Sequence, residues 1–230
     1  MINPDLTDLV LLNALYFKGK WQNAFDPALT KDRLFYPANG AARDVPMMRL
    51  SHTFLCRQSF GDQGMGTGYR AVRLPYGGGK LAMVIFLPDH DSSPAKLLQS
   101  LNGDTWQRVT MPGFTEKRDG VLVLPEFKIG STLDLIPPLQ KLGLNTAFDL
   151  NHSDFSGMFK DAHCISVVRQ KAFVEVAEEG TEAAAATTEA LMTRGIDPDR
   201  FVMIVDHPFL FAIVDARSQM ILFMGIVNAL

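Results

Sequence analysis

Residues 178–188 read Glu-Glu-Gly-Thr-Glu-Ala-Ala-Ala-Ala-Thr-Thr, and they open a connection over 178–200 between two apolar, strand-like segments. The connection has neither the glycine-rich composition of a flexible linker nor the apolar periodicity of an amphipathic helix. Its alanines favour helix and its threonines favour strand, so the local propensity is divided. Because long connections without regular structure are uncommon in compact domains and usually functional, this segment is the first candidate site.

Interpreted as a strand, the segment has a simple pattern with a period of two. One face carries only small side chains, which can enter a crowded interior at little steric cost. The members of that face are Thr181, Ala183, Ala185 and Thr187. A strand of this kind can join an existing sheet beside the strand that precedes it. The alternative, a flexible alanine-rich surface loop, stays open on these residues alone.

Apolar runs on both sides of this segment predict a strand-rich α+β fold. A strand is expected before it at 165–176, and a hairpin after it pairs 209–214 with 221–227. A glycine turn joins 69–76 to 81–87 in a second hairpin. Further strands are predicted at 9–17, covered on both faces, and at 121–129, with a bulge or an edge position at its proline. Helices are expected at 93–108 and 133–143.

Composition excludes several classes of protein. The 230 residues carry 22 Lys and Arg against 25 Asp and Glu, which lacks the basic excess of a nucleic-acid-binding protein. No apolar run is long enough to cross a membrane, and residues 1–5 do not resemble a signal peptide. Cys56 and Cys164 form neither a disulfide framework nor a metal-binding pattern. We therefore expect no nucleic acid, membrane, metal or cofactor as a partner.

Several short blocks together resemble the serpin family of serine protease inhibitors. They are Asn13-Ala-Leu-Tyr-Phe-Lys-Gly-Lys-Trp21, Val45-Pro-Met-Met48, Leu74-Pro-Tyr76, Ile85-Phe-Leu-Pro88, Leu124-Pro-Glu-Phe-Lys-Ile129, Asp154-Phe-Ser-Gly-Met158, Lys171-Ala-Phe-Val-Glu-Val176, Glu178 to Ala185, Asp206-His-Pro-Phe-Leu-Phe211 and Phe223-Met-Gly225. Each block is weak alone, but the blocks occur in the family's order from about residue 8 to the end. The resemblance implies a serpin fold with several sheets, a few helices and an exposed reactive-centre loop at about 178–200.

The resemblance also implies a mechanism. A serpin presents its loop as bait, the protease forms an acyl-enzyme, and the loop then inserts into the main sheet. Here the insertion would occur between the strands that contain Asn13 and Phe173. Spacing within the family places the cleaved bond at Arg194-Gly195, which implies a target of trypsin-like specificity held as a covalent acyl complex. Leu191 and Met192 remain alternative bait residues.

The family's pattern assigns further residues to the loop hinge and to the regions called breach and shutter, which control sheet opening. The hinge residues are Glu178, Gly180, Thr181, Glu182, Ala183, Ala184, Ala185 and Ala186, and the breach and shutter residues are Asn13, Trp21, Gln170 and His207. Gln170 replaces the usual shutter histidine, and its amide can still exchange hydrogen bonds with Asn13. Glu189 has the inward parity of Thr187, so complete insertion would bury a carboxylate.

The N-terminal part of the family's domain has no counterpart in this sequence. Residues 1–230 are therefore expected to form a single partial serpin domain, either as a fragment or with a partner chain. Family resemblance favours an extracellular protein, although the chain shows no secretion signal.

Two other classes of function were weighed. An enzyme is not expected, because the five histidines are scattered and neither HExxH nor GxSxG occurs. A non-inhibitory serpin relative, acting as a substrate, carrier or chaperone, and an inactive truncated fragment remain alternatives. The small, uncharged hinge side chains favour an inhibitor.

Overall fold

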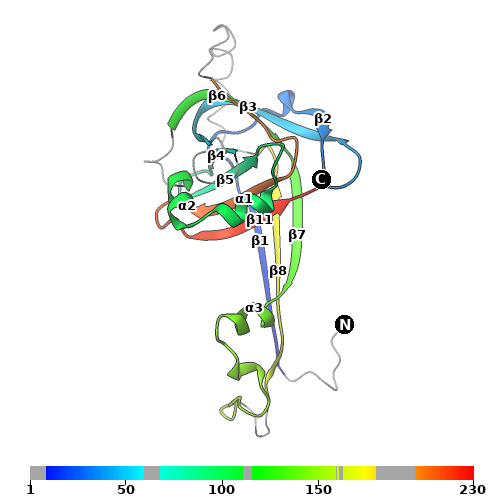
Figure 1. The fold of residues 1–230 in the computed structure, drawn as a ribbon, viewed down its shortest axis with the longest axis vertical. Coiled ribbons are helices and arrows are strands. Elements are labelled where there is room, and N and C mark those ends of the chain that lie inside the picture. Colours follow the sequence, from blue (N-terminus) through cyan, green and yellow to red (C-terminus); the bar gives the residue numbers. More distant parts are fainter. Residues whose placement is uncertain (1–8, 60–67, 111–115, 159, 161–162, 180–199) are drawn as a thin grey trace. The chain divides into compact units, whose positions relative to one another are not determined.

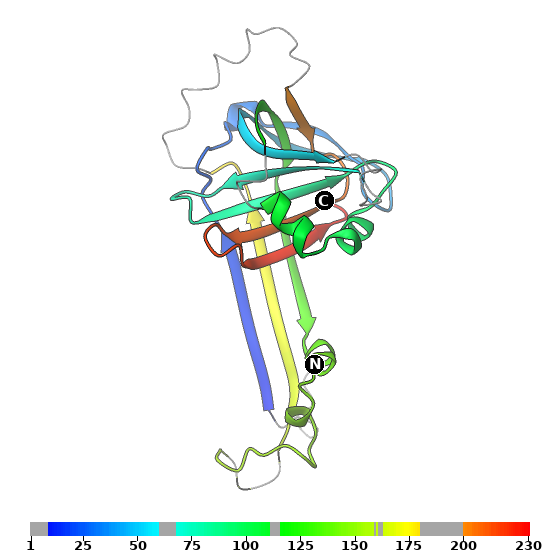
Figure 2. The ribbon, with the colours of Figure 1, turned by 60° about the vertical axis from the view of Figure 1, so that its left-hand side comes forward.

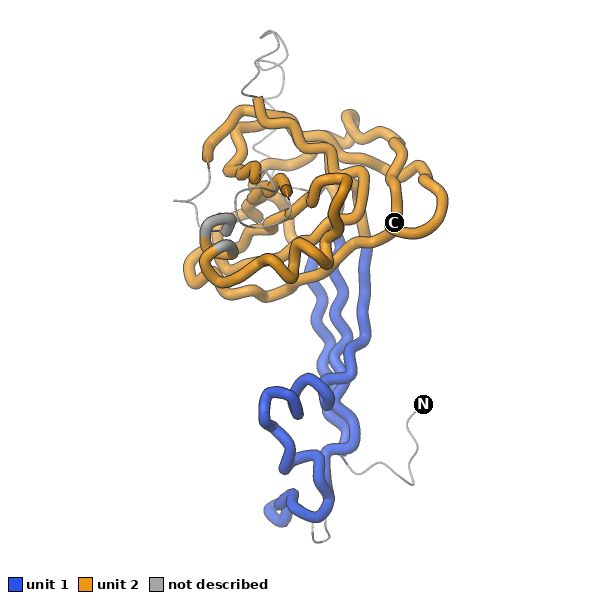
Figure 3. Tube along the Cα trace, in the orientation of Figure 1, with its two compact units in different colours: residues 1–18, 128–175 blue, residues 19–127, 176–230 orange. Residues whose placement is uncertain are grey.

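The computed structural model describes residues 9–59, 68–110, 116–158, 160, 163–179 and 200–230. They fall into two compact units (Figure 3). Unit 1 contains the chain up to Lys18 together with Lys128–Glu175, and unit 2 contains Gly19–Phe127 and Val176–Leu230. Each unit is described separately below.

Unit 1 is built on a three-stranded sheet in the order β1-β8-β7, whose strands lie side by side in Figure 2. The strands are β1 (Leu9–Lys18), β8 (Ile165–Val176) and β7 (Phe127–Asp134), which enters from unit 2. β8 has the predicted bounds, because its β-branched residues suit a half-buried pleated surface. A short helix, α3 (Ile136–Lys141), and a 3-10 turn, η4 (Thr146–Phe148), follow β7, so the helix predicted at 133–143 is confirmed.

The prediction that both faces of β1 are covered is wrong for the described part of the chain. Leu11 and Leu12 point to opposite faces of the sheet, and they are 50% and 70% exposed. The apolar run forms a strand, as predicted, but it lies at the edge of this sheet. An apolar sequence indicates that both faces of a strand are suited to burial, but it does not show whether another layer packs against them.

Unit 2 contains an eight-stranded sheet in which seven strands follow the order β11-β10-β5-β4-β3-β6-β9 (Figure 1). These strands are β11 (Ile221–Val227), β10 (Phe209–Asp215), β5 (Leu81–Pro88), β4 (Tyr69–Pro75), β3 (Arg43–Ser59), β6 (Glu116–Pro125) and β9 (Phe201–Ile204). The eighth, β2 (Lys31–Phe35), pairs with β3 after a 3-10 turn, η2 (Pro27–Leu29). Both predicted hairpins are confirmed as the antiparallel pairs β4–β5 and β10–β11.

One buried hydrophobic cluster of unit 2 lies where a helix covers β5 and β10. Leu97 of α1 (Pro94–Ser100) is fully buried in a cluster with Phe86 and Leu210. The helix begins at Ser93, whose hydroxyl accepts a hydrogen bond from the Lys96 amide, and Pro94 occupies its first turn. The single helix predicted at 93–108 is instead two helices, because the chain leaves helical geometry at Leu101 before α2 (Gly103–Thr110).

β6 differs at both ends from the strand expected at 121–129, because it begins at Glu116 and ends at Pro125. The strand ends at Pro125, and β7 begins at Phe127, so the proline marks a break and not a bulge within one strand. At Glu126 the backbone N–H donates to the carbonyl of Pro46. Further along β6, Gly120 pairs with Phe201 of β9, where any Cβ atom would collide with the Phe201 carbonyl oxygen.

Within the part of the chain described here, no helix combines the length and the apolar character needed to cross a membrane.

Candidate functional site

The candidate site in unit 2 is the loop base, defined here as Ala177–Glu179, where the chain leaves β8. Trp21 binds it twice: its indole Nε1 donates to the Ala177 carbonyl at 2.7 Å, and its backbone N–H donates to the Glu179 carbonyl at 2.9 Å. The backbone N–H of Phe25 donates to the Glu178 carbonyl at 3.2 Å. Three consecutive carbonyls of the loop base are therefore satisfied by one short segment, 21–25.

Aromatic packing holds that segment in place. Trp21 is 2% exposed and stacks on Tyr76 with ring centroids 4.4 Å apart and an interplanar angle of 11°. Phe25 meets the Trp21 ring edge-on at 6.0 Å. Stacked and edge-on aromatic pairs of this kind add to the stabilisation from burial alone. The indole N–H is consequently presented to the loop base in a fixed direction.

The Glu178 side chain adds a polar contact at the loop base. The hydroxyl of Thr30 donates to Glu178 Oε1 at 2.8 Å. A hydrogen bond with the Glu126 carboxyl group lowers the pKa of Glu178 below its usual value, and the bond from Thr30 lowers it further. The predicted hinge residue Glu178 is thus already bonded before the loop begins.

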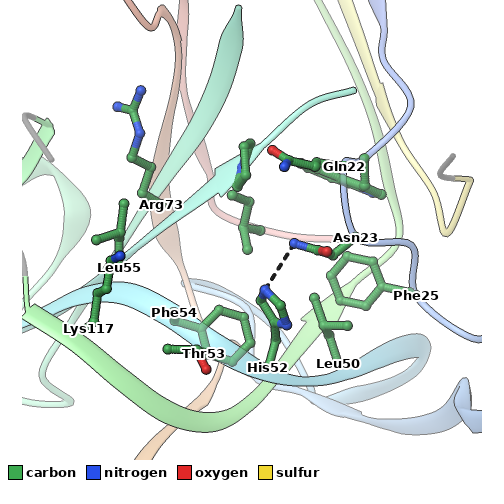
Figure 4. Close-up of a pocket in the computed structure, with 13 residues that line it drawn as sticks. Gln22, Asn23, Phe25, Leu50, His52, Thr53, Phe54, Leu55, Arg73 and Lys117 are labelled. Carbon is green, nitrogen blue, oxygen red and sulfur yellow. Dashed lines mark hydrogen bonds between the residues drawn. The ribbon is translucent and has the colours of Figure 1, made fainter. Parts of the chain in front are cut away.

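A cavity of about 320 Å³ lies beside this segment, lined in part by Trp21 and Phe25 (Figure 4). Figure 4 shows the Asn23 amide directed at the His52 ring, with Asn23 Nδ2 and His52 Nε2 3.1 Å apart. Burial lowers the pKa of His52, while the carboxylate of Asp119 acts in the opposite direction. His52 is therefore favoured in its neutral form, in which Nε2 can accept the hydrogen bond from the amide.

The other candidate site is the pair formed by β1 and β8 in unit 1. The two strands run parallel and are directly hydrogen-bonded, with Asn13 opposite Gln170 and Tyr16 opposite Phe173. The rings of Tyr16 and Phe173 stack with centroids 5.6 Å apart. The structure thus brings together two predicted shutter residues, and in the described residues no strand lies between β1 and β8.

One side chain, Glu175, joins all three strands of that sheet. From β1 it accepts hydrogen bonds from the Tyr16 hydroxyl and from Lys18 Nζ, both at 3.1 Å. From β7, Lys128 Nζ approaches it at 3.4 Å. These contacts, led by the hydrogen bond from Lys18, lower the pKa of Glu175. The ionised form of the carboxyl group is therefore favoured, and it holds β1 and β7 to β8.

The remaining predicted residues have different outcomes. His207 is buried in unit 2, where its ring nitrogens contact Asp206 and the Pro88 carbonyl. The hinge residues from Gly180 to Ala186 and the bond Arg194-Gly195 lie outside the described residues, so these assignments stay predictions.

Sequence reasoning placed Phe25 with Trp21 in the breach, but it missed Thr30 as a partner of the loop base and it missed the role of Glu175. Thr30 is 148 residues from Glu178, and Glu175 is 157 residues from Lys18. No local pattern announces contacts over such separations. The available signal was the pair of aromatic side chains after the first strand, Trp21 and Phe25, which resemblance to the family assigns to the breach.

Comparison with known proteins identifies the family. The family model "Serpin (serine protease inhibitor)" matches residues 1–230. Glia-derived nexin of Homo sapiens is 36% identical over 239 residues, covering 99% of this chain and 58% of that protein. Serpin B6 of Macaca fascicularis is 39% identical over 223 residues, covering 96% and 57%. Iripin-2 of Ixodes ricinus is 39% identical over 229 residues, covering 100% and 55%.

Among solved structures, a crystal structure of native protease nexin-1 with heparin matches with a TM-score of 0.84 and 32% identity, covering 100% of this chain and 59% of that one. The chain spans less than two thirds of the length of these relatives. The predicted strand-rich serpin fold is confirmed by this match. The sequence and its fold place the chain in the serpin family of serine protease inhibitors.

Proposed function

We propose that this chain contains the reactive loop and the receiving sheet of an inhibitor of a trypsin-like serine protease. The inhibitor acts by cleavage of the loop and its insertion into the sheet. The observation that supports this most is the parallel pairing of β1 with β8 over ten register positions, from Leu9↔Ile165 to Lys18↔Glu175. The predicted reactive loop follows β8 directly, so its first residues can turn back along that strand.

A segment that turns back after β8 runs antiparallel to β8 and therefore also to β1. Its insertion replaces one parallel ladder by two antiparallel ladders, and antiparallel pairing is slightly more stable per residue. The inward side chains from Thr181 to Thr187 are small, so the new strand fits with little steric cost. Under this proposal the closed pair of β1 and β8 is held kinetically, and insertion is favourable once the loop is cut.

The chemistry begins at the Arg194 carbonyl. The protease serine Oγ attacks that carbon, the bond from Arg194 to Gly195 breaks, and the Gly195 nitrogen leaves with a proton supplied by the protease histidine. An ester then joins Arg194 to the protease. A basic side chain at this position pairs with the carboxylate that trypsin-like enzymes place in their specificity pocket. Insertion of the loop before water attacks the ester leaves the protease covalently bound.

The test is to mix the chain with trypsin and to analyse the products on a denaturing gel and by intact mass spectrometry. The expected product is a species at the summed mass of the protease and the chain up to Arg194. Arg194→Ala should abolish this species, whereas Arg194→Lys should keep it, because trypsin also accepts lysine. Unchanged complex formation with Arg194→Ala would refute the assigned bond, whereas Leu191 and Met192 are alternatives for a protease of different specificity.

A second variant separates inhibition from simple cleavage. Ala183→Arg places a long charged side chain on the face that must enter the sheet, so the variant should be cut without forming the covalent species. A covalent complex that survives Ala183→Arg would contradict hinge insertion. If the unmodified chain is only nicked, it is a substrate-like relative or an inactive fragment. The proposal includes no catalytic activity of the chain itself, and an extracellular location stays a prediction.

A further inference from the structure

Three potential metal ligands meet in unit 2 at a place separate from the loop base. His90 lies in the turn after β5, while Asp206 and His207 immediately precede β10. Each can offer one ligand atom, and these atoms lie within 4.8 Å of one another. The rings of His90 and His207 approach with centroids 4.3 Å apart. Asp206 and His207 are neighbours in the sequence, but His90 is more than one hundred residues away, so no ligand-spacing pattern joins the three.

The hydrogen bonds of His207 determine which of its nitrogens can bind a metal. Its Nε2 lies 2.9 Å from the Pro88 carbonyl oxygen, which can only accept, so Nε2 carries a hydrogen. Its Nδ1 lies 2.8 Å from Asp206 Oδ1, which as a carboxylate oxygen is also an acceptor. Because Nε2 faces the Pro88 carbonyl, Nδ1 is the ring nitrogen that remains to face a ligand. Nδ1 is therefore the ligand atom, and Asp206 supplies the second.

This arrangement matches the outer shell of natural metal sites. A histidine that binds a metal typically donates its other ring N–H to a carbonyl or carboxylate, which fixes its tautomer and orientation. The Pro88 carbonyl performs that task for His207, which is 8% exposed. Asp206 is also held in place, because its carbonyl accepts a hydrogen bond from the Tyr36 backbone N–H at 2.7 Å.

The third ligand can complete the site by a side-chain rotation. Zinc binds nitrogen and oxygen ligands at about 2.0–2.2 Å, so in a tetrahedral site the ligand atoms lie roughly 3.3 Å apart. His207 Nδ1 and Asp206 Oδ1 are 2.8 Å apart, so they must separate by about half an ångström to bind one ion. His90 is exposed, so its ring is free to move the remaining distance. A set of two imidazoles and one carboxylate suits Zn²⁺ better than Ca²⁺ or Mg²⁺, which prefer oxygen ligands.

A cavity beside the cluster provides room for a solvent ligand. It has a volume of about 260 Å³ and is lined by His90, His207 and Ser92 among others. The Ser92 hydroxyl is buried and has no hydrogen-bond partner among the described residues. A water molecule bound to the metal would satisfy it and would fill the fourth coordination position.

We propose that His90 and His207, together with Asp206, bind one Zn²⁺ ion whose fourth ligand is solvent. Zinc replaces the direct contact between His207 Nδ1 and Asp206 Oδ1, which move apart to bind it, and any proton shared in that contact is released to the buffer. The site goes beyond the proposed inhibitory function, because it needs neither the reactive loop nor the pairing of β1 with β8.

The test uses the full chain without an affinity tag, freed of metal by chelator treatment. Titration with Zn²⁺ in a calorimeter should give one site per chain, and repeating it in buffers of different ionisation enthalpy measures proton release. Titration with Co²⁺ should give the intense visible absorption of four-coordinate cobalt. In nitrogen-15 spectra of the histidine rings, zinc should shift His207 Nδ1 while Nε2 keeps its hydrogen.

His90→Ala and Asp206→Asn each remove one ligand while leaving the buried His207 in place. Each should weaken zinc binding by at least about 10–100-fold, the loss typical of removing even an outer-shell partner. His152→Ala is the matched control, because His152 also bonds an aspartate, Asp149 at 2.7 Å, but belongs to no three-ligand cluster in the described residues. Absence of a one-to-one site, or equal losses in His152→Ala and His90→Ala, would overturn the proposal.

Discussion

At the scale of single residues, His52 makes stability depend on pH. Burial lowers its pKa, so the folded chain binds a proton less readily than the unfolded chain, in which the pKa is about 6.5. The stability that His52 contributes is thus present above that value and is lost as pH falls below it. The melting temperature should fall between pH 7 and pH 5, and His52→Gln should reduce this fall.

The control for this prediction is His152→Gln, whose side chain is exposed and paired with Asp149. It should leave the pH dependence of melting unchanged. If His52→Gln melts with the same pH dependence as the unmodified chain, then the Asn23 contact does not select neutral His52.

A second residue with a specific role is Trp21. Trp21→Phe keeps a ring against Tyr76 but removes the N–H that donates to the Ala177 carbonyl. The lost hydrogen bond and the smaller ring should cost about 1–3 kcal/mol in the free energy of unfolding. Hydrogen exchange of the amides at 177–179 should become faster, because the loop base loses a fixed partner.

Trp106→Phe provides the matched control for Trp21→Phe. Trp106 stacks on Phe86 in the core under α2, so its replacement removes an indole from unit 2 without touching the loop base. It should lower stability and leave exchange at 177–179 unchanged. Equal acceleration in both variants would mean that exchange there follows global unfolding and not the bond from Trp21.

At the scale of elements, Glu175 controls how firmly β1 and β7 are held to β8. Glu175→Gln removes the charge that attracts Lys18 and Lys128, and an amide accepts hydrogen bonds less strongly than a carboxylate. Amide exchange in 9–18 should become faster. If the proposed function is correct, loop insertion after cleavage should also become faster, because the closed pair opens more readily.

Glu116→Gln is the comparison variant for Glu175→Gln. Glu116 pairs only locally with Arg118 on β6, where the pair is exposed. Such pairs contribute little to stability, so exchange in 9–18 should not change. Slow exchange retained in Glu175→Gln would indicate that backbone pairing alone keeps β1 on β8.

Elements also show how far the sequence predicts the fold. The bounds of β8 and the two hairpins follow from apolar runs and glycine turns, which are local signals. The break at Glu126 was missed because apolar side chains continue at every second residue across it. The end of α1 at Leu101 was missed although Asn102-Gly103 follows it, a pair typical of a helix break. The candidate site was also predicted only in part. Trp21 was found through family resemblance, whereas its hydrogen bond to Ala177 joins residues 156 positions apart and has no local sequence signature.

At the scale of the whole molecule, the exposed apolar side chains of β1 should determine solution behaviour. Leu11, Leu12, Leu15 and Tyr16 are between 36% and 70% exposed. Exposed contiguous apolar surface favours association and binds hydrophobic dyes. Leu12→Lys should therefore reduce both dye fluorescence and concentration-dependent association measured by light scattering, with a change in unfolding free energy within about 0.5 kcal/mol.

Leu142→Lys is the corresponding control, because Leu142 is 83% exposed just after α3 and not on a strand of the sheet. It should alter association less than Leu12→Lys does. A large loss of stability in Leu12→Lys would show that this side chain is covered in solution, for instance by a second copy of the chain.

The collision that forbids a side chain at Gly120 has a mechanical consequence. The segment 180–199 is tethered at both ends, by Trp21 on one side and by the four register pairs of β9 with β6 on the other. Under the proposed function, these two anchors limit how far the uncut loop can enter the sheet, and cleavage removes the second one. Gly120→Ala would weaken the pairing of β9 with β6, because the new Cβ atom collides with Phe201, and would thereby free the chain at the C-terminal end of the loop. The loop of such a variant should be drawn into the sheet without ever being cut.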